Sequence, residues 1–155
     1  MGKKPGFDIQ AAHKYFSAEC FNRAWDFIDK PTRSKSEEDK LLQLSLASIW
    51  HWTQREDCTS TNLSVGYWQV SRAFSLLRQA GNAKHYGELC LEVSQGEAVL
   101  PFYRGYAYEA LARAEMVAGN EDEVEKYLIQ AHQVAAVLPD PEEKKQLLSD
   151  LATIR

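Results

Sequence analysis

The sequence predicts an all-α protein in which antiparallel helix hairpins stack side by side. Apolar residues recur at spacings of three and four along most of the chain, which is the period of an amphipathic helix. No segment alternates apolar and polar residues over the length of a strand. The tripeptide Ala-Gly-Asn at 80–82 returns at 118–120. A repeat of roughly 40 residues holds two helices and a tight turn, so we expect a stack of about seven helices that ends in a capping helix.

Cap and turn residues divide the chain into these helices. The first is expected from near Asp8 to Asp29, and Pro31 ends it. Ser36 is the expected N-cap of the second, whose apolar face includes Trp50. Gly81 and Gly119 are expected to end the third and fifth helices in the left-handed conformation. We therefore expect one domain, 1–155, with a divergent hairpin at 8–55, repeat-like hairpins at 63–95 and 102–139, and a capping helix at 141–154.

Composition indicates a globular protein and excludes several classes. Of the 155 residues 45% are hydrophobic and 26% are charged, which is typical of a folded domain. The net charge of −4 argues against a nucleic-acid binder, which usually carries a basic excess. No apolar run approaches the roughly 18 residues of a membrane span. No signal peptide is expected, because no apolar run follows the first lysines, so the expected location is cytoplasmic.

The last hairpin resembles the tetratricopeptide repeat. The resemblance rests on one set of aromatic, large, small and glycine positions: Tyr108, Leu111, Ala112, Gly119, Val124, Leu128 and Ala131. It extends less well to 63–95, where Phe74 stands at the small-residue position, and Glu115 stands where the family usually has an aromatic side chain. The resemblance implies a right-handed stack whose concave groove is lined by the first helix of each hairpin.

A narrower resemblance covers most of the chain. The segments CFNRAWDFIDK (20–30), IWHW (49–52), YWQVSRAFSLL (67–77) and YEALARAEMVAG (108–119) are similar to a family of small, uncharacterised bacterial proteins with tetratricopeptide-like helices. This resemblance implies no activity.

The groove implied by the repeat contains aromatic and polar side chains, as binding surfaces do. These candidate ligand-binding residues are Trp68, Ser71, Tyr106, Glu109 and Arg113. The first hypothesis is therefore a non-enzymatic module that binds a protein or peptide partner through the concave face. The alternative for Trp68 and Tyr106 is that they pack into the next hairpin or the capping helix.

A second hypothesis is a small-molecule-binding protein or enzyme with a pocket around His51, Trp52, Trp25 and Asp26, because aromatic and titratable side chains are dense there. His51 is otherwise a partly buried side chain hydrogen-bonded to a neighbouring helix. A third hypothesis is a homodimer that pairs an exposed apolar groove with its own copy.

The motifs of several chemistries are missing. The sequence has no nucleophile elbow, P-loop or dinucleotide-binding glycine pattern, so no catalytic residue is assigned and no cofactor is expected. The four histidines fall on four different helices, and the three cysteines lie far apart, so no metal site and no disulfide framework is expected.

Overall fold

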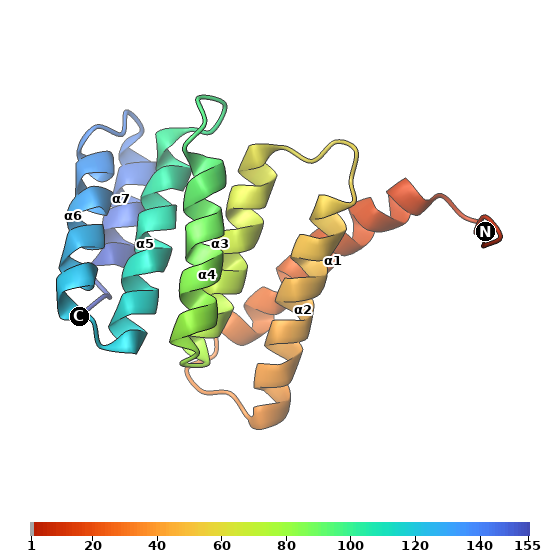
Figure 1. Cartoon of the computed structure of the whole chain (residues 1–155), viewed down its shortest axis with the longest axis horizontal. Coiled ribbons are helices and arrows are strands. Elements are labelled where there is room, and N and C mark those ends of the chain that lie inside the picture. Colours follow the sequence, from red (N-terminus) through yellow and green to blue (C-terminus); the bar gives the residue numbers. More distant parts are fainter. Residues whose placement is uncertain (1) are drawn as a thin grey trace.

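The computed structural model describes residues 2–155, which form seven helices and no strand, as predicted (Figure 1). The helices are α1 (Ile9–Ile28), α2 (Lys35–Thr53), α3 (Ser60–Leu76), α4 (Ala80–Ser94), α5 (Pro101–Ala118), α6 (Glu121–Ala136) and α7 (Pro141–Leu151). They pack as the sequential antiparallel hairpins α1–α2, α3–α4 and α5–α6, and α7 packs against α5 and α6. The prediction of an all-α stack of hairpins is confirmed.

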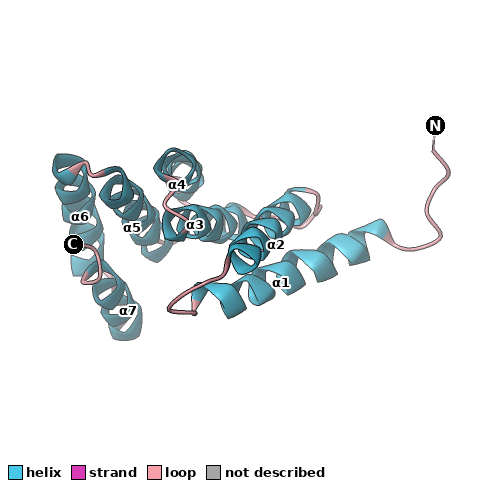
Figure 2. Ribbon diagram, turned by 90° about the horizontal axis from the view of Figure 1, so that it is seen from below, coloured by secondary structure: helices cyan, strands magenta, loops and turns pink. Residues whose placement is uncertain are grey.

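The helices follow an arc when the molecule is seen from below (Figure 2). α1 and α7 lie at the two ends of the arc and toward the same side, whereas α4 lies on the opposite side. We call the side of α1 and α7 the inner side. The beginning of α1 extends past the rest of the stack (Figure 1).

Hydrogen-bonded caps fix where the first two helices begin. The Asp8 carboxylate accepts the amide N–H of Ala11 at 3.1 Å and starts α1, as predicted. α2 begins with Ser34 as its cap: the Ser34 hydroxyl accepts the Glu37 amide, and the Glu37 carboxylate accepts the Ser34 amide. The expected cap at Ser36 is wrong, because this reciprocal pair satisfies two amides and starts the helix before Ser36.

The repeat has a different register from the one that the tripeptide indicated. The number of residues from the start of α3 to the start of α5 equals the number from the start of α4 to the start of α6. This common offset is three residues longer than the offset between the two Ala-Gly-Asn tripeptides. Each turn between the helices of a hairpin contains one residue in the left-handed conformation. It is Arg78, with φ 59°, between α3 and α4, and Gly119, with φ 78°, between α5 and α6, and the same longer offset separates these two residues. Gly81 lies inside the first turn of α4 and does not end α3, so the predicted helix end at Gly81 is wrong.

Contacts inside the two hairpins repeat with this longer offset. Each turn is closed by an amide that reaches back five residues, from Gln79 to the Phe74 carbonyl at 2.9 Å and from Asn120 to the Glu115 carbonyl at 3.0 Å. One aromatic pair also recurs across each hairpin, Tyr67 with Tyr86 and Tyr108 with Tyr127. The two hairpins are therefore structural repeats, although their sequences align poorly.

The buried core runs through the whole stack as three adjacent clusters, the first shared by α1, α2 and α3 and the last by α5, α6 and α7. Gly105 allows α7 to approach α5 closely, because a Cβ atom there would lie 2.6 Å from Leu147 Cδ2. This approach brings side chains of α7 to the inner side of α5.

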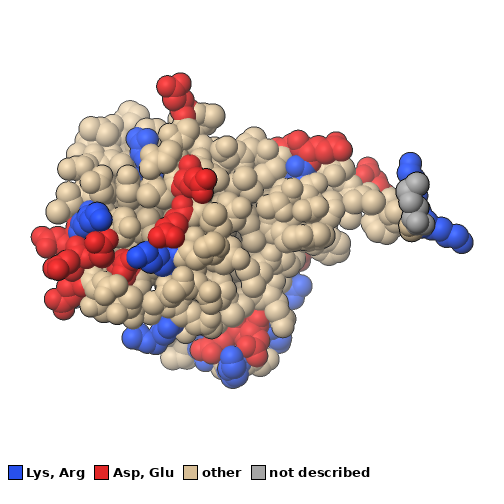
Figure 3. Space-filling view, in the orientation of Figure 1, with Lys and Arg blue, Asp and Glu red and all other residues tan. Residues whose placement is uncertain are grey.

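Charged side chains lie along the edges of the face in Figure 3 and in a strip within its left part. Acidic side chains gather at the left, over α6, whose first turn contains Glu121, Asp122 and Glu123. Negative charge at that position complements the positive end of the helix dipole. Within residues 2–155 no helix combines the length and the apolar character needed to cross a membrane.

Candidate functional site

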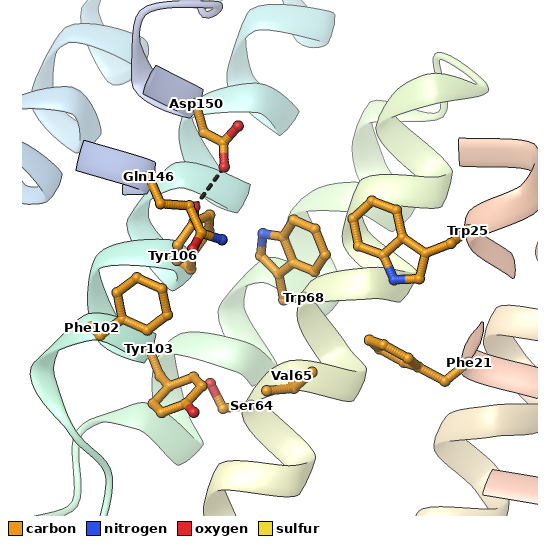
Figure 4. A pocket seen from close by; sticks show the side chains of 10 residues that line it. All are labelled: Phe21, Trp25, Ser64, Val65, Trp68, Phe102, Tyr103, Tyr106, Gln146 and Asp150. Carbon is orange, nitrogen blue, oxygen red and sulfur yellow. Dashed lines mark hydrogen bonds between the residues drawn. The ribbon is translucent and has the colours of Figure 1, made fainter. Parts of the chain in front are cut away.

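A pocket lined by aromatic side chains lies on the inner side, between α1, α3, α5 and α7 (Figure 4). Its volume is about 260 Å³. We call it the aromatic pocket. Its lining residues are Phe21, Trp25, Ser64, Val65, Trp68, Phe102, Tyr103, Tyr106, Gln146 and Asp150.

Contacts between rings of three helices shape the walls of the pocket. Trp25 of α1 stacks on Trp68 of α3, with 5.8 Å between ring centroids and 26° between the planes. Tyr106 of α5 meets Trp68 edge to face at 5.8 Å, and Phe102 meets Tyr106 in the same way at 5.1 Å. Phe21 lies one helical turn before Trp25 and so projects from the same side of α1.

A buried carboxylate behind the pocket fixes the Trp68 ring. The Trp68 indole N–H donates to Glu109 Oε2 at 2.8 Å. Glu109 is 1% exposed, and its other oxygen accepts a hydrogen bond from Arg113 Nε. Arg72 Nη1 lies 3.9 Å from the same oxygen. Both oxygens of this buried carboxylate therefore have a hydrogen-bond partner, and a guanidinium lies against it.

Arg113 and Tyr106 connect α5 to the end of α7. Arg113 Nη2 donates to the Asp150 carbonyl at 3.0 Å and to the Thr153 hydroxyl at 2.6 Å. The Tyr106 hydroxyl donates to Asp150 Oδ2 at 2.5 Å, as Figure 4 shows. Burial, and then the hydrogen bond to Asp150, raises the pKa of the Tyr106 phenol far above its ordinary value. Tyr106 is therefore a neutral donor that holds the carboxylate at the edge of the pocket.

A second hollow adjoins the aromatic pocket along α1 and α3. It is lined by Ala18, Phe21, Asn22, Trp52, Thr61, Asn62, Val65 and Tyr103. Phe21, Val65 and Tyr103 line both hollows, so the two are neighbours, and we call them together the groove. The ring of Trp52, which lines this hollow, lies 3.9 Å from the Arg55 guanidinium, and Arg55 is hydrogen-bonded to Asp57.

The five residues predicted to line the concave face fall into three groups. Trp68 and Tyr106 line the aromatic pocket, whereas Glu109 and Arg113 lie buried behind it and support its walls. Ser71 does not line the groove, contrary to the prediction, because it is fully buried and its hydroxyl donates to the Ala83 carbonyl of α4 at 2.7 Å. Ser71 was placed on the groove by the offset between the two tripeptides, which is three residues shorter than the offset of the structural repeat.

The four residues of the second hypothesis do not surround one cavity. Trp25 lines the aromatic pocket, and Trp52 lines the adjoining hollow. Asp26 is exposed on α1 and lines neither. His51 also lies outside both and contacts α1 near its beginning, where its Nδ1 atom is 2.8 Å from His13 Nδ1.

His13 and His51 form a hydrogen-bonded pair surrounded by aromatic rings. The ring of Phe16 lies 5.5 Å from that of His51, and Trp50 contacts both histidines edge to face. Burial, and then the nearby His13, lowers the pKa of His51. Trp50 was predicted on the apolar face of its helix but is 54% exposed. The expectation that His51 bonds to a neighbouring helix is met by His13 of α1.

Several lining residues had no place in the sequence prediction. Phe21 and Phe102 each lie four residues before a predicted site aromatic, Trp25 and Tyr106, so helical spacing was a usable signal. Gln146 and Asp150 had no such signal, because their helix was interpreted only as a cap and Asp150 meets a side chain 44 positions away.

Comparisons of the chain with protein-family models, with curated proteins and with solved structures found no match. The two family resemblances therefore stay predictions, and the function is argued below from the site alone.

Proposed function

We propose that the protein is a non-enzymatic interaction module that binds a peptide or an extended segment of a protein partner along its inner side. The observation that carries this proposal is the aromatic pocket, where rings from three helices line an open hollow of about 260 Å³. Tryptophan and tyrosine are enriched at the residues that dominate binding energy in protein interfaces.

The shape of the site supports an extended partner. The aromatic pocket continues into the hollow beside Trp52, so a chain that places one side chain in the pocket has a path along α1 and α3. The walls are held in place before binding by the contacts of Trp68 with Glu109 and of Tyr106 with Asp150. A site that is already ordered loses less entropy when a ligand binds.

We further propose that the hairpins stack in the right-handed manner of tetratricopeptide repeats. The structural repeat of α3–α4 in α5–α6 and the repeated aromatic pairs inside these hairpins support this arrangement. The inner side would then correspond to the concave groove of that family, which is the face that the sequence predicted for binding.

The test is a peptide-display selection on the immobilised full-length protein, followed by titration of the enriched peptides. The pocket variant is Trp25→Leu, which keeps apolar packing but removes the ring. The control is Trp50→Leu, which removes an exposed tryptophan outside the groove. We expect peptides that bind the wild type and Trp50→Leu equally and that bind Trp25→Leu at least about fivefold more weakly.

Two results would contradict the proposal: no peptide is enriched, or the enriched peptides bind Trp25→Leu as well as they bind the wild type. Thermal unfolding of each variant by circular dichroism verifies that binding is compared between folded proteins. Sedimentation equilibrium at high concentration tests the homodimer in parallel. A dimer that Trp25→Leu dissociates would show that the inner side binds a second copy and not a peptide.

A further inference from the structure

We infer that the aromatic pocket receives the cationic side chain of an arginine or lysine, with Asp150 as its counter-ion. This inference rests on the proposed function, because the cation is taken to belong to a peptide partner.

Three polar groups of the pocket walls already have partners inside the protein. The Trp68 N–H donates to Glu109, and the Tyr106 O–H donates to Asp150. The Ser64 hydroxyl is paired with the Ser94 hydroxyl at 2.7 Å. A carboxylate accepts hydrogen bonds, so a ligand group that contacts Asp150 needs to bring its own N–H donors.

Asp150 is the only charged side chain among the lining residues. Its carboxylate accepts a hydrogen bond from Tyr106 and forms no ion pair within residues 2–155. The nearby cations Arg72 and Arg113 both approach Glu109, and neither lines the pocket. An anionic ligand would meet a carboxylate there, whereas a cation would complete the pairing of Asp150.

The remaining walls also favour a cation. Six of the ten lining residues are aromatic, and two of these are tryptophans, whose ring faces attract cations most strongly. A purely apolar side chain would cover Asp150 without giving it a partner, and burying an unpaired charge is costly. A guanidinium or ammonium group on an aliphatic stem satisfies the rings and the carboxylate together.

The experiment titrates the full-length protein with N-acetyl-arginine amide and with N-acetyl-citrulline amide, which has nearly the same shape but no charge. Tryptophan fluorescence and isothermal titration calorimetry report binding. We expect the arginine probe to bind at least about tenfold more tightly than the citrulline probe, because a hydrogen bond to a charged group is worth more than a neutral one.

Four variants separate charge from ring stacking. Asp150→Asn should weaken the arginine probe about tenfold, whereas Asp26→Asn, which removes an exposed carboxylate outside the pocket, should leave it unchanged. Trp25→Leu should weaken the probe about fivefold, and Trp25→Phe, which keeps an aromatic face, should retain most of the binding. Equal binding of both probes, or an Asp150→Asn variant that binds arginine as the wild type does, would overturn the inference.

Failure of this inference is distinguishable from failure of the proposed function. The selected peptides could require Trp25, contain no common basic residue and bind Asp150→Asn as well as the wild type. That result would support the binding module and contradict the inferred cationic side chain. Conversely, the arginine probe could bind in an Asp150-dependent way while no peptide is selected. That result would support a cation site in the pocket and contradict the proposal that the partner is a peptide.

Discussion

The buried pair of Glu109 and Arg113 gives the sharpest test of how the pocket is held. The substitution Arg113→Met keeps the aliphatic volume of the side chain but removes its guanidinium. Glu109 then loses its closest cation, and the Asp150 carbonyl and the Thr153 hydroxyl each lose a donor. What remains for Glu109 is the Trp68 indole N–H and the guanidinium of Arg72 at 3.9 Å.

The expected cost follows from the burial of the pair. Glu109 is 1% exposed and Arg113 is 6% exposed, so the orphaned carboxylate cannot turn to water. Breaking a buried pair from one side typically costs about 3–5 kcal/mol of unfolding free energy. In a chain of this length each kcal/mol lowers the melting temperature by roughly 2–4 °C, so a decrease of roughly 6–20 °C is expected.

The double variant Arg113→Met/Glu109→Leu separates a lost contact from a stranded charge. Urea unfolding followed by circular dichroism measures both variants against the wild type. If the stranded carboxylate causes the loss, the double variant is more stable than Arg113→Met alone, although it has lost more contacts. A cost below about 1 kcal/mol for Arg113→Met, or a double variant less stable than the single one, would refute this reasoning.

Three further predictions concern turns, titration and thiol reactivity. Gly119→Ala should cost about 1 kcal/mol of unfolding free energy because φ at Gly119 is 78°, whereas Gly81→Ala, in the first turn of α4, should be neutral or stabilising. Equal losses of stability for the two variants in thermal melts would instead support the repeat offset that the tripeptide indicated. Because the pKa of His51 is lowered in the folded protein, the unfolded chain binds a proton first as the pH falls. The stability that the neutral His51 contributes is therefore complete above about pH 6.5 and is lost as the pH falls through the lowered value. The urea midpoint of unfolding should decrease from pH 7.5 to 5.5, and it should depend less on pH in the double variant His13→Asn/His51→Asn. Burial raises the pKa of the Cys90 thiol to about 12, so mass spectrometry after brief iodoacetamide treatment at pH 8 should find it unmodified in the native protein and modified in urea.

The helices themselves could be predicted because their signals are local. Apolar spacing of three and four and the breaks at proline gave seven segments close to the observed ones. The cap of α2 was missed by two residues, since two serines precede the acidic first turn. Ser34, and not Ser36, has a glutamate three residues later that can complete the reciprocal cap.

The repeat register failed for a physical reason. A left-handed turn residue is usually glycine, but between α3 and α4 Arg78 adopts that conformation, and the visible Gly81 lies three residues too late. With the offset that separates the helix starts, Phe74 aligns with Glu115 and not with the small-residue position. Ser71 then takes the small-residue position, which agrees with its complete burial against α4. The register thus explains the departure at Phe74, whereas Glu115 still stands where the family usually has an aromatic side chain.

The site was only partly predictable because it depends on distances between helices. Trp68 and Tyr106 were predicted from the tripeptide offset, and both line the pocket, although the offset of the helix starts pairs Trp68 with Glu109 instead. That Trp25 belongs beside them depends on how α1 crosses α3, which no local pattern encodes. Asp150 reaches Tyr106 only because Gly105 lets α7 approach α5 closely.

The pocket also shows why the face of a helix is insufficient to predict the charge of a site. Placing Arg113 on the groove would suggest a surface that attracts anions. In the structure its guanidinium is occupied by Glu109 and by the end of α7, and it thereby holds Asp150 at the pocket edge. The cation predicted for the groove acts as a buried support, and the group presented to a ligand is a carboxylate. The charge of a ligand that suits the pocket therefore depends on which charges of the protein are already paired. Asp150→Asn should change ligand binding with little effect on the free energy of unfolding, whereas Arg113→Met should mainly lower the free energy of unfolding.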